Sequence, residues 1–346
     1  FWGIFVLYQV FGIVRPDHVL VDNHRPKVLI TNPYVPKIAF DLLATCYIRN
    51  CDIVSIQNET KEEIVSKVKG VDAILWGSHI KIDKDVLDAA GDQMKVIGAM
   101  SAGYDHIDLP ELKKRGIKLG NTPKVLNGAV ADTAVLLALA AARRLHEGRL
   151  LIDSGKWNPN EWILGQDIEG STVGIIGLGG IGQAIAKRVK AFDVKQILYT
   201  GHKEKAEGNE LGAKFLPLED RDELLRQSDF VFVAAPLTAE TEGMCNEEFF
   251  SKMKKTAVFV NISRGKVVDQ KALYKALKQG QIFAAGLDVM TPEPLPTTDE
   301  LLTLPNLVLM PHWGSATEQT RNAMAELTVR NIMNALKGEP MVTPLT

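Results

Sequence analysis

Three polar side chains of different chemistry each follow an apolar, β-rich run late in the chain. They are Arg264, Glu293 and His312, a guanidinium, a carboxylate and an imidazole. In a doubly wound parallel sheet, ligands bind at the carboxyl ends of the strands, so these three groups could converge on one ligand. An imidazole can exchange protons near neutral pH and a guanidinium can bind an anion. Each residue alone also fits a surface arginine, a loop glutamate or a core histidine.

A glycine-rich turn lies between an apolar run and a helix-compatible segment at residues 172–186. Gly177 permits a tight turn, Gly179 lets the backbone approach a pyrophosphate, and Gly182 lets the helix pack on the strand. A helix that begins here offers free N–H groups and a positive dipole end to phosphates. The pattern predicts a nicotinamide dinucleotide site that includes Gly180 and Ile181.

The end of the next predicted strand, residues 196–200, bears on the choice between NAD and NADP. An NAD site normally has a carboxylate there, which accepts the ribose 2′-OH. This strand instead runs into His202, Lys203 and Lys205. These residues favour NADP(H), with both lysines as candidate partners of the 2′-phosphate. NAD(H) stays possible because Glu204 lies among them, and the segment also fits a solvated charged loop.

The motifs together resemble those of the D-2-hydroxyacid dehydrogenase family, and within it the reductases of glyoxylate and hydroxypyruvate. The resemblance extends from about residue 26 to the C-terminus. It is carried by the glycine turn and by four further segments, at residues 100–108 (MSAGYDHID), 199–201 (YTG), 261–265 (NISRG) and 292–296 (PEPLP), together with His312.

The resemblance implies roles for the three polar residues. His312 would be the acid/base, Glu293 its partner, and Arg264 the anchor of an α-keto acid. Reduction of a keto acid needs side chains of these types. Hydride arriving at the keto carbon builds negative charge on the keto oxygen, and an imidazolium can protonate that oxygen. A carboxylate favours the protonated ring, and a guanidinium fork can grip carboxylate and keto oxygen together.

Further site residues follow from the same resemblance. The backbone N–H groups of Ala102 and Gly103 would bind the substrate carboxylate, Asp288 would orient substrate or nicotinamide, and Ser315 would lie beside the substrate. Asp288 also fits an ordinary capping or turn residue. Three residues would line the cofactor: Pro236, Ile262 and Gly314.

Some residues depart from the family pattern. Trp313 stands after His312 where a smaller aliphatic residue is usual, and its bulk could narrow the substrate pocket. Gly180 and His202 each stand where an arginine is common, which weakens the preference for NADPH. Trp157 and Trp162 frame a segment whose family counterpart carries a tryptophan that reaches the partner's active site, and the sequence does not show which of them, if either, would do so.

The elements that position these residues form two series of apolar runs. The first runs are at residues 28–31, 53–56, 73–76 and 96–100, with helical segments such as 61–69 and 84–90 between them. The second are at residues 173–177, 197–200, 230–234, 257–262, 284–289 and 307–310. This alternation predicts an α/β protein with two doubly wound parallel-sheet domains, Rossmann-like or flavodoxin-like.

Two long helices would join the domains. Residues 130–153, rich in Ala and Leu and without Pro, predict one helix, and residues 318–337 predict another that returns the chain to the first unit. We therefore expect a substrate domain of residues 26–126 and 317–346 and a dinucleotide-binding domain of residues 127–316. Residues 1–25 form an N-terminal extension with an apolar run, whose role stays open.

Composition narrows the partners. A formal net charge of −2 gives no general attraction to nucleic acid or anionic membranes, so we expect neither as a partner of the core. The three cysteines, Cys46, Cys51 and Cys245, match no disulfide framework or metal motif. We expect buried thiols, no metal and a cytoplasmic location.

The sequence thus predicts a homodimeric enzyme that reduces glyoxylate or hydroxypyruvate to glycolate or D-glycerate. Its dimeric state is implied by the resemblance alone. One alternative is another D-2-hydroxyacid dehydrogenase, such as one for 3-phosphoglycerate. Another is a corepressor-like binding protein that senses a dinucleotide, because such proteins carry the same three polar residue types.

Overall fold

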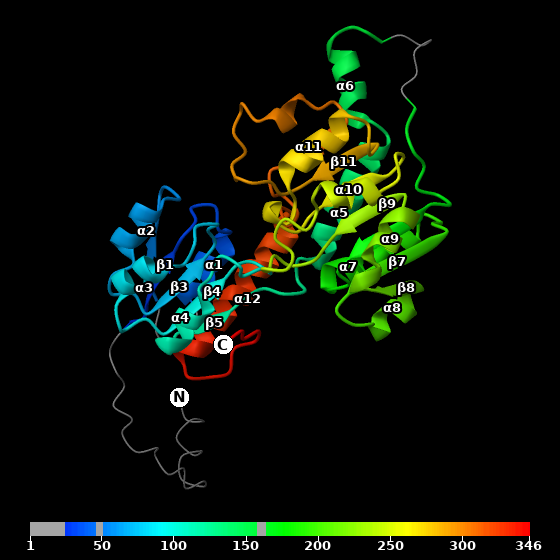
Figure 1. Ribbon diagram of the computed structural model, residues 1–346. Helices are drawn as coiled ribbons and strands as arrows, with labels where there is room; N and C mark the ends of the chain where they lie inside the picture. The colour runs from blue at the N-terminus through cyan, green and yellow to red at the C-terminus, as the bar shows by residue number, and fades with distance from the viewer. Residues whose placement is uncertain (1–24, 46–50, 158–163) are drawn as a thin grey trace, which may run out of the picture.

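The computed structural model describes residues 25–45, 51–157 and 164–346. It contains two separate parallel sheets flanked by helices (Figure 1). The smaller sheet has the strand order β2-β1-β3-β4-β5, and the larger has the order β12-β11-β10-β9-β6-β7-β8. The expected fold class, two doubly wound α/β units, is confirmed. The N-terminal extension lies outside the described residues, apart from Arg25.

The smaller sheet is formed by the first part of the chain. Its central strands are buried along their whole length, because helices cover both faces of the sheet. Its strands are β1 (Lys27–Ile30), β2 (Asp52–Ser55), β3 (Ala73–Trp76), β4 (Val96–Ala99) and β5 (Lys118–Gly120). The helices between them are α1 (Lys37–Thr45), α2 (Lys61–Lys67), α3 (Lys84–Ala90) and α4 (Leu109–Lys114).

The larger sheet follows, and three aromatic rings, Phe249, Phe250 and Phe259, pack edge-to-face in its core. Its strands are β6 (Thr172–Ile176), β7 (Gln196–Gly201), β8 (Ala213–Pro217), β9 (Phe230–Val233), β10 (Val258–Asn261), β11 (Ala284–Leu287) and β12 (Leu307–Leu309). Its helices are α7 (Gly180–Lys190), α8 (Ala206–Leu211), α9 (Arg221–Gln227), α10 (Glu247–Lys252) and α11 (Gln270–Lys278), with 3₁₀ turns at Leu218–Asp220, Gly265–Val267 and Glu300–Thr303.

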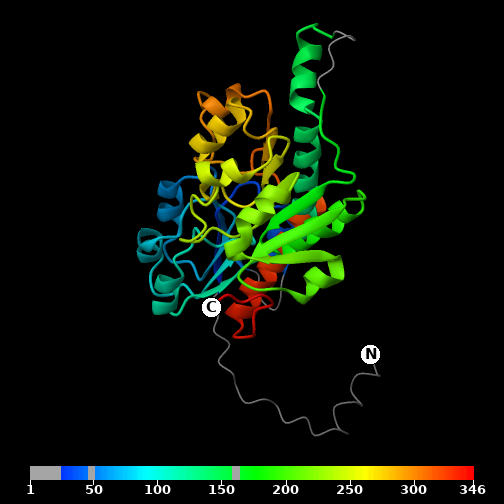
Figure 2. The same ribbon diagram turned by 45° about the vertical axis from the view of Figure 1, so that its right-hand side comes forward.

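The prediction of a single helix over residues 130–153 is wrong. The chain forms α5 (Asn127–Ala142) and α6 (Leu145–Asp153), with Arg144 between them in a left-handed conformation at φ 53°. No Gly or Pro marks this break. It is a tertiary effect, because the returning chain caps α5 when the Gln166 N–H donates to the Ala142 carbonyl at 3.0 Å. In Figures 1 and 2, α6 extends away from both sheets.

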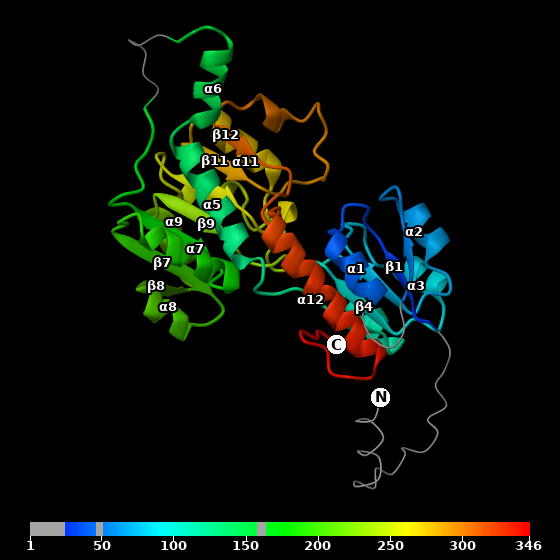
Figure 3. The same ribbon diagram turned by 180° about the vertical axis from the view of Figure 1, so that it is seen from behind.

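The second long helix is confirmed as α12 (Glu318–Leu336), which Thr317 caps by accepting the Thr320 N–H. It packs on the smaller sheet and on α1, as Figure 3 shows, so the last helix of the chain returns to the first sheet. The fit is close at Gly98 in β4, where a Cβ atom would lie 2.8 Å from Ile332 and Thr328. Within the described part of the chain, no helix is long and apolar enough to cross a membrane.

Helix α5 rests directly on the larger sheet at Gly286 in β11. A Cβ atom there would lie 2.8 Å from the Leu137 Cβ atom and 3.0 Å from the Leu137 carbonyl oxygen. We predict that Gly286→Ala lowers the free energy of unfolding by about 1–3 kcal/mol, because the helix must move away from the strand. Urea denaturation at constant m-value measures this. Gly148→Ala in α6, where a methyl group meets open space, is the control and should be neutral or stabilising. An equal response of the two variants would contradict the close contact.

Candidate active site

Arg264 lies in a turn just after β10, and a buried amide holds this turn in place. The Asn261 Nδ2 donates to the Arg264 carbonyl at 3.0 Å, and the Asn261 Oδ1 accepts the Ser263 N–H at 3.0 Å. Asn261 itself is fully buried. The backbone from which the guanidinium extends is therefore fixed from within the larger sheet.

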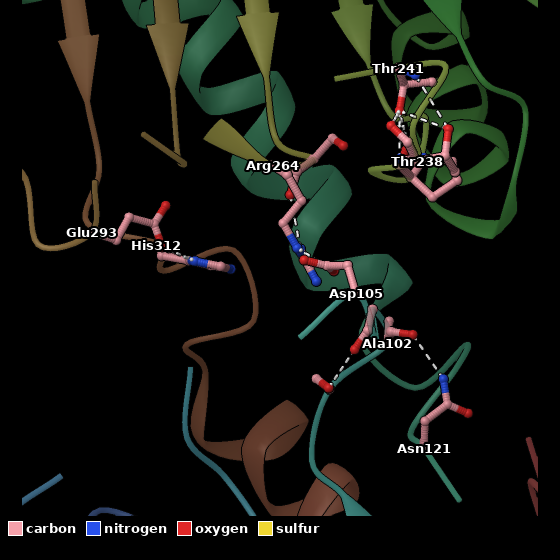
Figure 4. Close-up of polar contacts among 12 residues, drawn as sticks. Ala102, Asp105, Asn121, Thr238, Thr241, Arg264, Glu293 and His312 are labelled. Atoms are coloured by element: carbon pink, nitrogen blue, oxygen red, sulfur yellow. Dashed lines mark hydrogen bonds and ion pairs between the residues drawn. The ribbon is translucent and has the colours of Figure 1, made fainter. Parts of the chain in front are cut away.

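The guanidinium of Arg264 crosses to the loop that follows β4 of the smaller sheet (Figure 4). Its Nε donates to the Asp105 Oδ1 at 2.9 Å, and its Nη1 donates to the Ser263 carbonyl at 2.9 Å. A Cβ atom at Gly103 would lie only 1.9 Å from the Arg264 Nη2. The loop after β4 thus touches Arg264 at two positions, and one of them needs glycine for the guanidinium to stay where it is.

His312 and Glu293 form a hydrogen-bonded pair, as expected. The His312 Nδ1 lies 2.8 Å from the Glu293 Oε2, and the Glu293 Oε1 accepts the Met290 N–H at 2.9 Å. Burial by itself raises the pKa of Glu293, but the hydrogen bond and the charge of His312 outweigh it, so the pKa lies below its ordinary value. The carboxylate can therefore orient the ring and leave its other nitrogen, Nε2, for a substrate oxygen.

Asp288 holds the backbone of the His312 loop. Its two carboxylate oxygens accept the N–H groups of Trp313 and Gly314, at 2.7 and 2.8 Å, and its carbonyl accepts the His312 N–H at 2.8 Å. It is 2% exposed, and burial raises its pKa although both N–H groups favour the ionised form. The loop needs such support because His312 has a φ of 56°. Contact of Asp288 with substrate or nicotinamide stays a prediction.

Ala102 and Gly103 lie in the loop that Arg264 contacts. The Ala102 carbonyl accepts the Asn121 Nδ2 at 2.8 Å, and the Gly103 carbonyl accepts the Ser101 Oγ at 2.7 Å. Among the described residues, neither the Ala102 nor the Gly103 N–H donates a hydrogen bond. The loop therefore has fixed carbonyls and two free donors, which is what binding of a carboxylate requires.

His79 also belongs to this site, and the sequence reasoning missed it. Its ring centroid lies 4.8 Å from that of His312, tilted by 40°. Its backbone is held by Glu59, whose Oε1 accepts the Ser78 Oγ at 2.7 Å and the His79 N–H at 3.1 Å. Burial, and then the charge of His312, lower the pKa of His79. The signal was available, because His79 follows the third predicted strand as the other site residues follow theirs.

His79, Glu293 and His312 also offer three potential metal-ligand atoms within 4.8 Å of one another. Two imidazoles and one carboxylate are a donor set that transition metals bind. The Glu293 carboxylate already accepts a hydrogen bond from the His312 Nδ1, and a metal ion bound through that nitrogen would replace it. The expectation of a site without metal stays a prediction.

The glycine turn joins β6 to α7. Gly177 has a φ of 93°, and a Cβ atom at Gly182 would lie 2.2 Å from the Gly177 carbonyl oxygen. A Cβ atom at Gly179 would meet no atom within 4 Å, so this face of the turn is open. No side chain caps the N-terminus of α7, which begins at Gly180. The donors of this helix end are therefore available to a pyrophosphate.

The basic segment directly follows β7, the strand next to this turn, which ends at Gly201. His202 and Lys203 are exposed, and the Lys205 backbone N–H donates to the Tyr199 hydroxyl at 2.9 Å. The His202 Nε2 lies 3.8 Å from the Glu240 Oε2, a carboxylate that the sequence reasoning did not consider. The end of β7 therefore meets a carboxylate that belongs to another loop.

The remaining predicted residues lie on loops at the same edge of the larger sheet. Pro236 follows β9, and its carbonyl accepts the Thr241 Oγ1 at 2.6 Å. Ile262 follows β10 and is buried. Gly314 is held by Asp288, and the Ser315 Oγ lies 3.5 Å from the Arg321 Nη1. Their contacts with a cofactor or substrate stay predictions.

Comparison with known proteins identifies the family. The family described as D-isomer specific 2-hydroxyacid dehydrogenase, NAD binding domain, matches residues 135–314. The human glyoxylate reductase/hydroxypyruvate reductase is 48% identical over 324 residues, which are 92% of this chain and 97% of that protein. The chain belongs to the D-2-hydroxyacid dehydrogenase family. A glyoxylate reductase of Pyrococcus horikoshii is also similar, with 44% identity over 322 residues, 91% of this chain and 94% of that protein.

Solved structures of D-2-hydroxyacid dehydrogenases have the same fold. A glyoxylate reductase from Paecilomyes thermophila has a TM-score of 0.82 at 31% identity, covering 93% of this chain and 98% of its own. An NADPH-dependent glyoxylate/hydroxypyruvate reductase from Sinorhizobium meliloti, solved with NADP and malonate, has a TM-score of 0.81 at 32% identity, covering 93% and 97%. This D-2-hydroxyacid dehydrogenase therefore uses a nicotinamide dinucleotide, as the glycine turn predicted.

Of the three tryptophans named in the sequence analysis, Trp313 and Trp157 lie within the described residues. Trp313 is 58% exposed, and Trp157, which follows α6, is 77% exposed. Trp162 lies outside the described residues. A narrowing of the substrate pocket by Trp313 stays a prediction, and the contact of either other tryptophan with a partner subunit stays open.

The support of the His312 loop by Asp288 can be tested. Asp288→Asn keeps the size of the side chain but replaces one acceptor oxygen by an NH₂ group, so one backbone N–H loses its partner. We predict a loss of about 1–3 kcal/mol in the free energy of unfolding at neutral pH. Urea denaturation measures it, and Asp92→Asn at an exposed position should change it by less than about 0.5 kcal/mol. Unchanged stability with altered ligand binding would instead favour direct contact of Asp288 with the ligands.

Proposed function

We propose that this dehydrogenase reduces glyoxylate and hydroxypyruvate to glycolate and D-glycerate, with NADPH preferred over NADH. The observation that carries the proposal is the His312–Glu293 pair, placed with Arg264 on loops of adjacent strands. The names of the relatives support the substrates. Residues 26–126 with 317–346 form the substrate domain, residues 127–316 bind the dinucleotide, and two chains form a homodimer.

The keto acid binds between the two sheets. Its carboxylate accepts the N–H groups of Ala102 and Gly103, which have no partner among the described residues, and Arg264 grips it from the other side. Asp105 holds the Nε of Arg264, so the guanidinium is oriented before the substrate arrives. Preorganised donors lower the cost of ordering the site at the moment of reaction.

The dinucleotide binds along the edge that carries the glycine turn. The open face at Gly179 and the uncapped N-terminus of α7 fit a pyrophosphate. Pro236, Ile262 and Gly314 line the cofactor, and Lys203 and Lys205 are the candidate partners of a 2′-phosphate. When bound, the reduced nicotinamide supplies a hydride to the keto carbon.

His312 supplies the proton. As negative charge builds on the keto oxygen, the His312 Nε2 donates its proton to that oxygen, and Arg264 stabilises the same charge. Glu293 keeps the ring oriented, and because its pKa is lowered it is ionised at neutral pH and stabilises the protonated imidazole. The product is the 2-hydroxy acid, and the reverse reaction uses His312 as the base.

Steady-state turnover of glyoxylate, hydroxypyruvate, pyruvate and 3-phosphohydroxypyruvate with NADPH and with NADH tests the proposal. We expect the first two substrates with NADPH to give the highest kcat/KM. His312→Ala should lose about 10²- to 10⁴-fold in kcat while still binding the dinucleotide. Preference for the phosphorylated substrate would indicate a phosphoglycerate-type dehydrogenase. Dinucleotide binding without turnover of any substrate would indicate a corepressor-like binding protein.

The anchoring role of Arg264 has a sharper test. Arg264→Lys keeps the charge and loses the fork, so the contact with the keto oxygen, which strengthens in the transition state, is lost. We predict a higher KM together with a lower kcat, measured by steady-state kinetics with the fold checked by circular dichroism. Arg149→Lys on the exposed face of α6 is the control and should leave both constants unchanged. Wild-type constants in Arg264→Lys would remove Arg264 from this role.

A further inference from the structure

Two loops flank the glycine turn, and they come from strands on either side of β6. In the larger sheet β6 lies between β9 and β7, so the loop after β9 and the loop after β7 face each other across the turn. This is the point where the strand order reverses, and a dinucleotide must pass between the two loops there. A charged side chain on either loop can therefore act on the adenosine half of a dinucleotide bound there.

The two loops meet through one pair of charged residues. His202, after β7, places its Nε2 3.8 Å from the Oε2 of Glu240, after β9, which is ion-pair distance when the imidazole is protonated. Their side chains are 79% and 74% exposed. An exposed pair of this kind contributes little to stability. The pair can instead affect the binding of a charged ligand between the two loops.

The loop that carries Glu240 is an ordered turn. The Thr241 Oγ1 donates to the Pro236 carbonyl at 2.6 Å, and the Thr238 N–H donates to the Thr241 Oγ1 at 2.8 Å (Figure 4). The Glu242 N–H donates to the Thr238 carbonyl at 2.9 Å. Glu240 lies within this closed set of hydrogen bonds, so its backbone is fixed opposite the end of β7.

We propose that Glu240 is a cofactor-specificity residue that weakens NADPH relative to NADH. The carboxylate lies at ion-pair distance from His202, which could otherwise donate to a 2′-phosphate, and it adds negative charge beside the segment that carries Lys203. A 2′-phosphate carries up to two negative charges and is repelled, whereas a ribose 2′-OH can donate to the carboxylate. The inference rests on the part of the proposed function that places the adenosine ribose at the end of β7.

Binding titrations of NADPH and NADH to the full chain without keto acid test this, alongside kcat/KM with one keto acid. Glu240→Gln should raise the ratio of NADPH affinity to NADH affinity roughly three- to fivefold, the size expected for one exposed charge. The effect should shrink at high ionic strength because salt screens exposed charges. Glu242→Gln is the matched control, since it removes the same charge from the same turn, and should change the ratio less than about 1.5-fold.

An unchanged ratio in Glu240→Gln, or an equal change in Glu242→Gln, would overturn the proposal. A second variant separates this from failure of the proposed function. Lys203→Ala with Lys205→Ala should weaken NADPH and leave NADH unchanged. If the lysine pair matters and Glu240 does not, only the role of Glu240 is wrong. If neither matters, the 2′-phosphate lies elsewhere and the proposal falls with that placement.

Discussion

The parallel direction of every strand pair is the constraint on which the site depends. Parallel strands all end at one edge of a sheet, so the loops that follow them gather there. Arg264 and His312 follow β10 and β12 of the larger sheet, and Gly103 and His79 follow β4 and β3 of the smaller one. The contacts of Arg264 with Asp105, and of His312 with His79, show that these two edges face each other.

Polar side chains keep these loops in place. Asn261 ties the turn of Arg264, Asp288 ties the loop of His312, and Glu59 ties the loop of His79. Asn261 and Asp288 are almost inaccessible to water, and an unpaired polar atom is costly when it is buried. Each side chain therefore holds the loop whose backbone groups are its hydrogen-bond partners. The groups placed for chemistry are partly exposed, and Asn261 and Asp288 position two of them from beneath, whereas Glu59 holds the His79 loop from the surface.

The sequence predicted the strands that have strong apolar runs, and it predicted the residues that follow them. It failed where tertiary contacts decide. Strands β5 and β8 were missed, because one has only three residues and the other contains Lys214 and ends at Pro217. The break at Arg144 depends on a cap from Gln166, and the meeting of His202 with Glu240 depends on strand order. His79 follows β3 of the smaller sheet, and its place beside His312 depends on how the two sheets face each other, which no strand pattern shows.

Because Gly103 lies so close to Arg264, a substitution at residue 103 should affect stability and activity to different extents. A methyl group at residue 103 would collide only with the end of a long, flexible side chain, which can swing into solvent, so folding would hardly register the change. The guanidinium would nevertheless have to leave its place beside Asp105. Among variants of this protein, selection for expression or thermal stability would thus retain alanine at position 103. Selection for catalytic activity would remove it. The position of the Arg264 guanidinium therefore depends on glycine at residue 103, although the two residues lie far apart in the sequence.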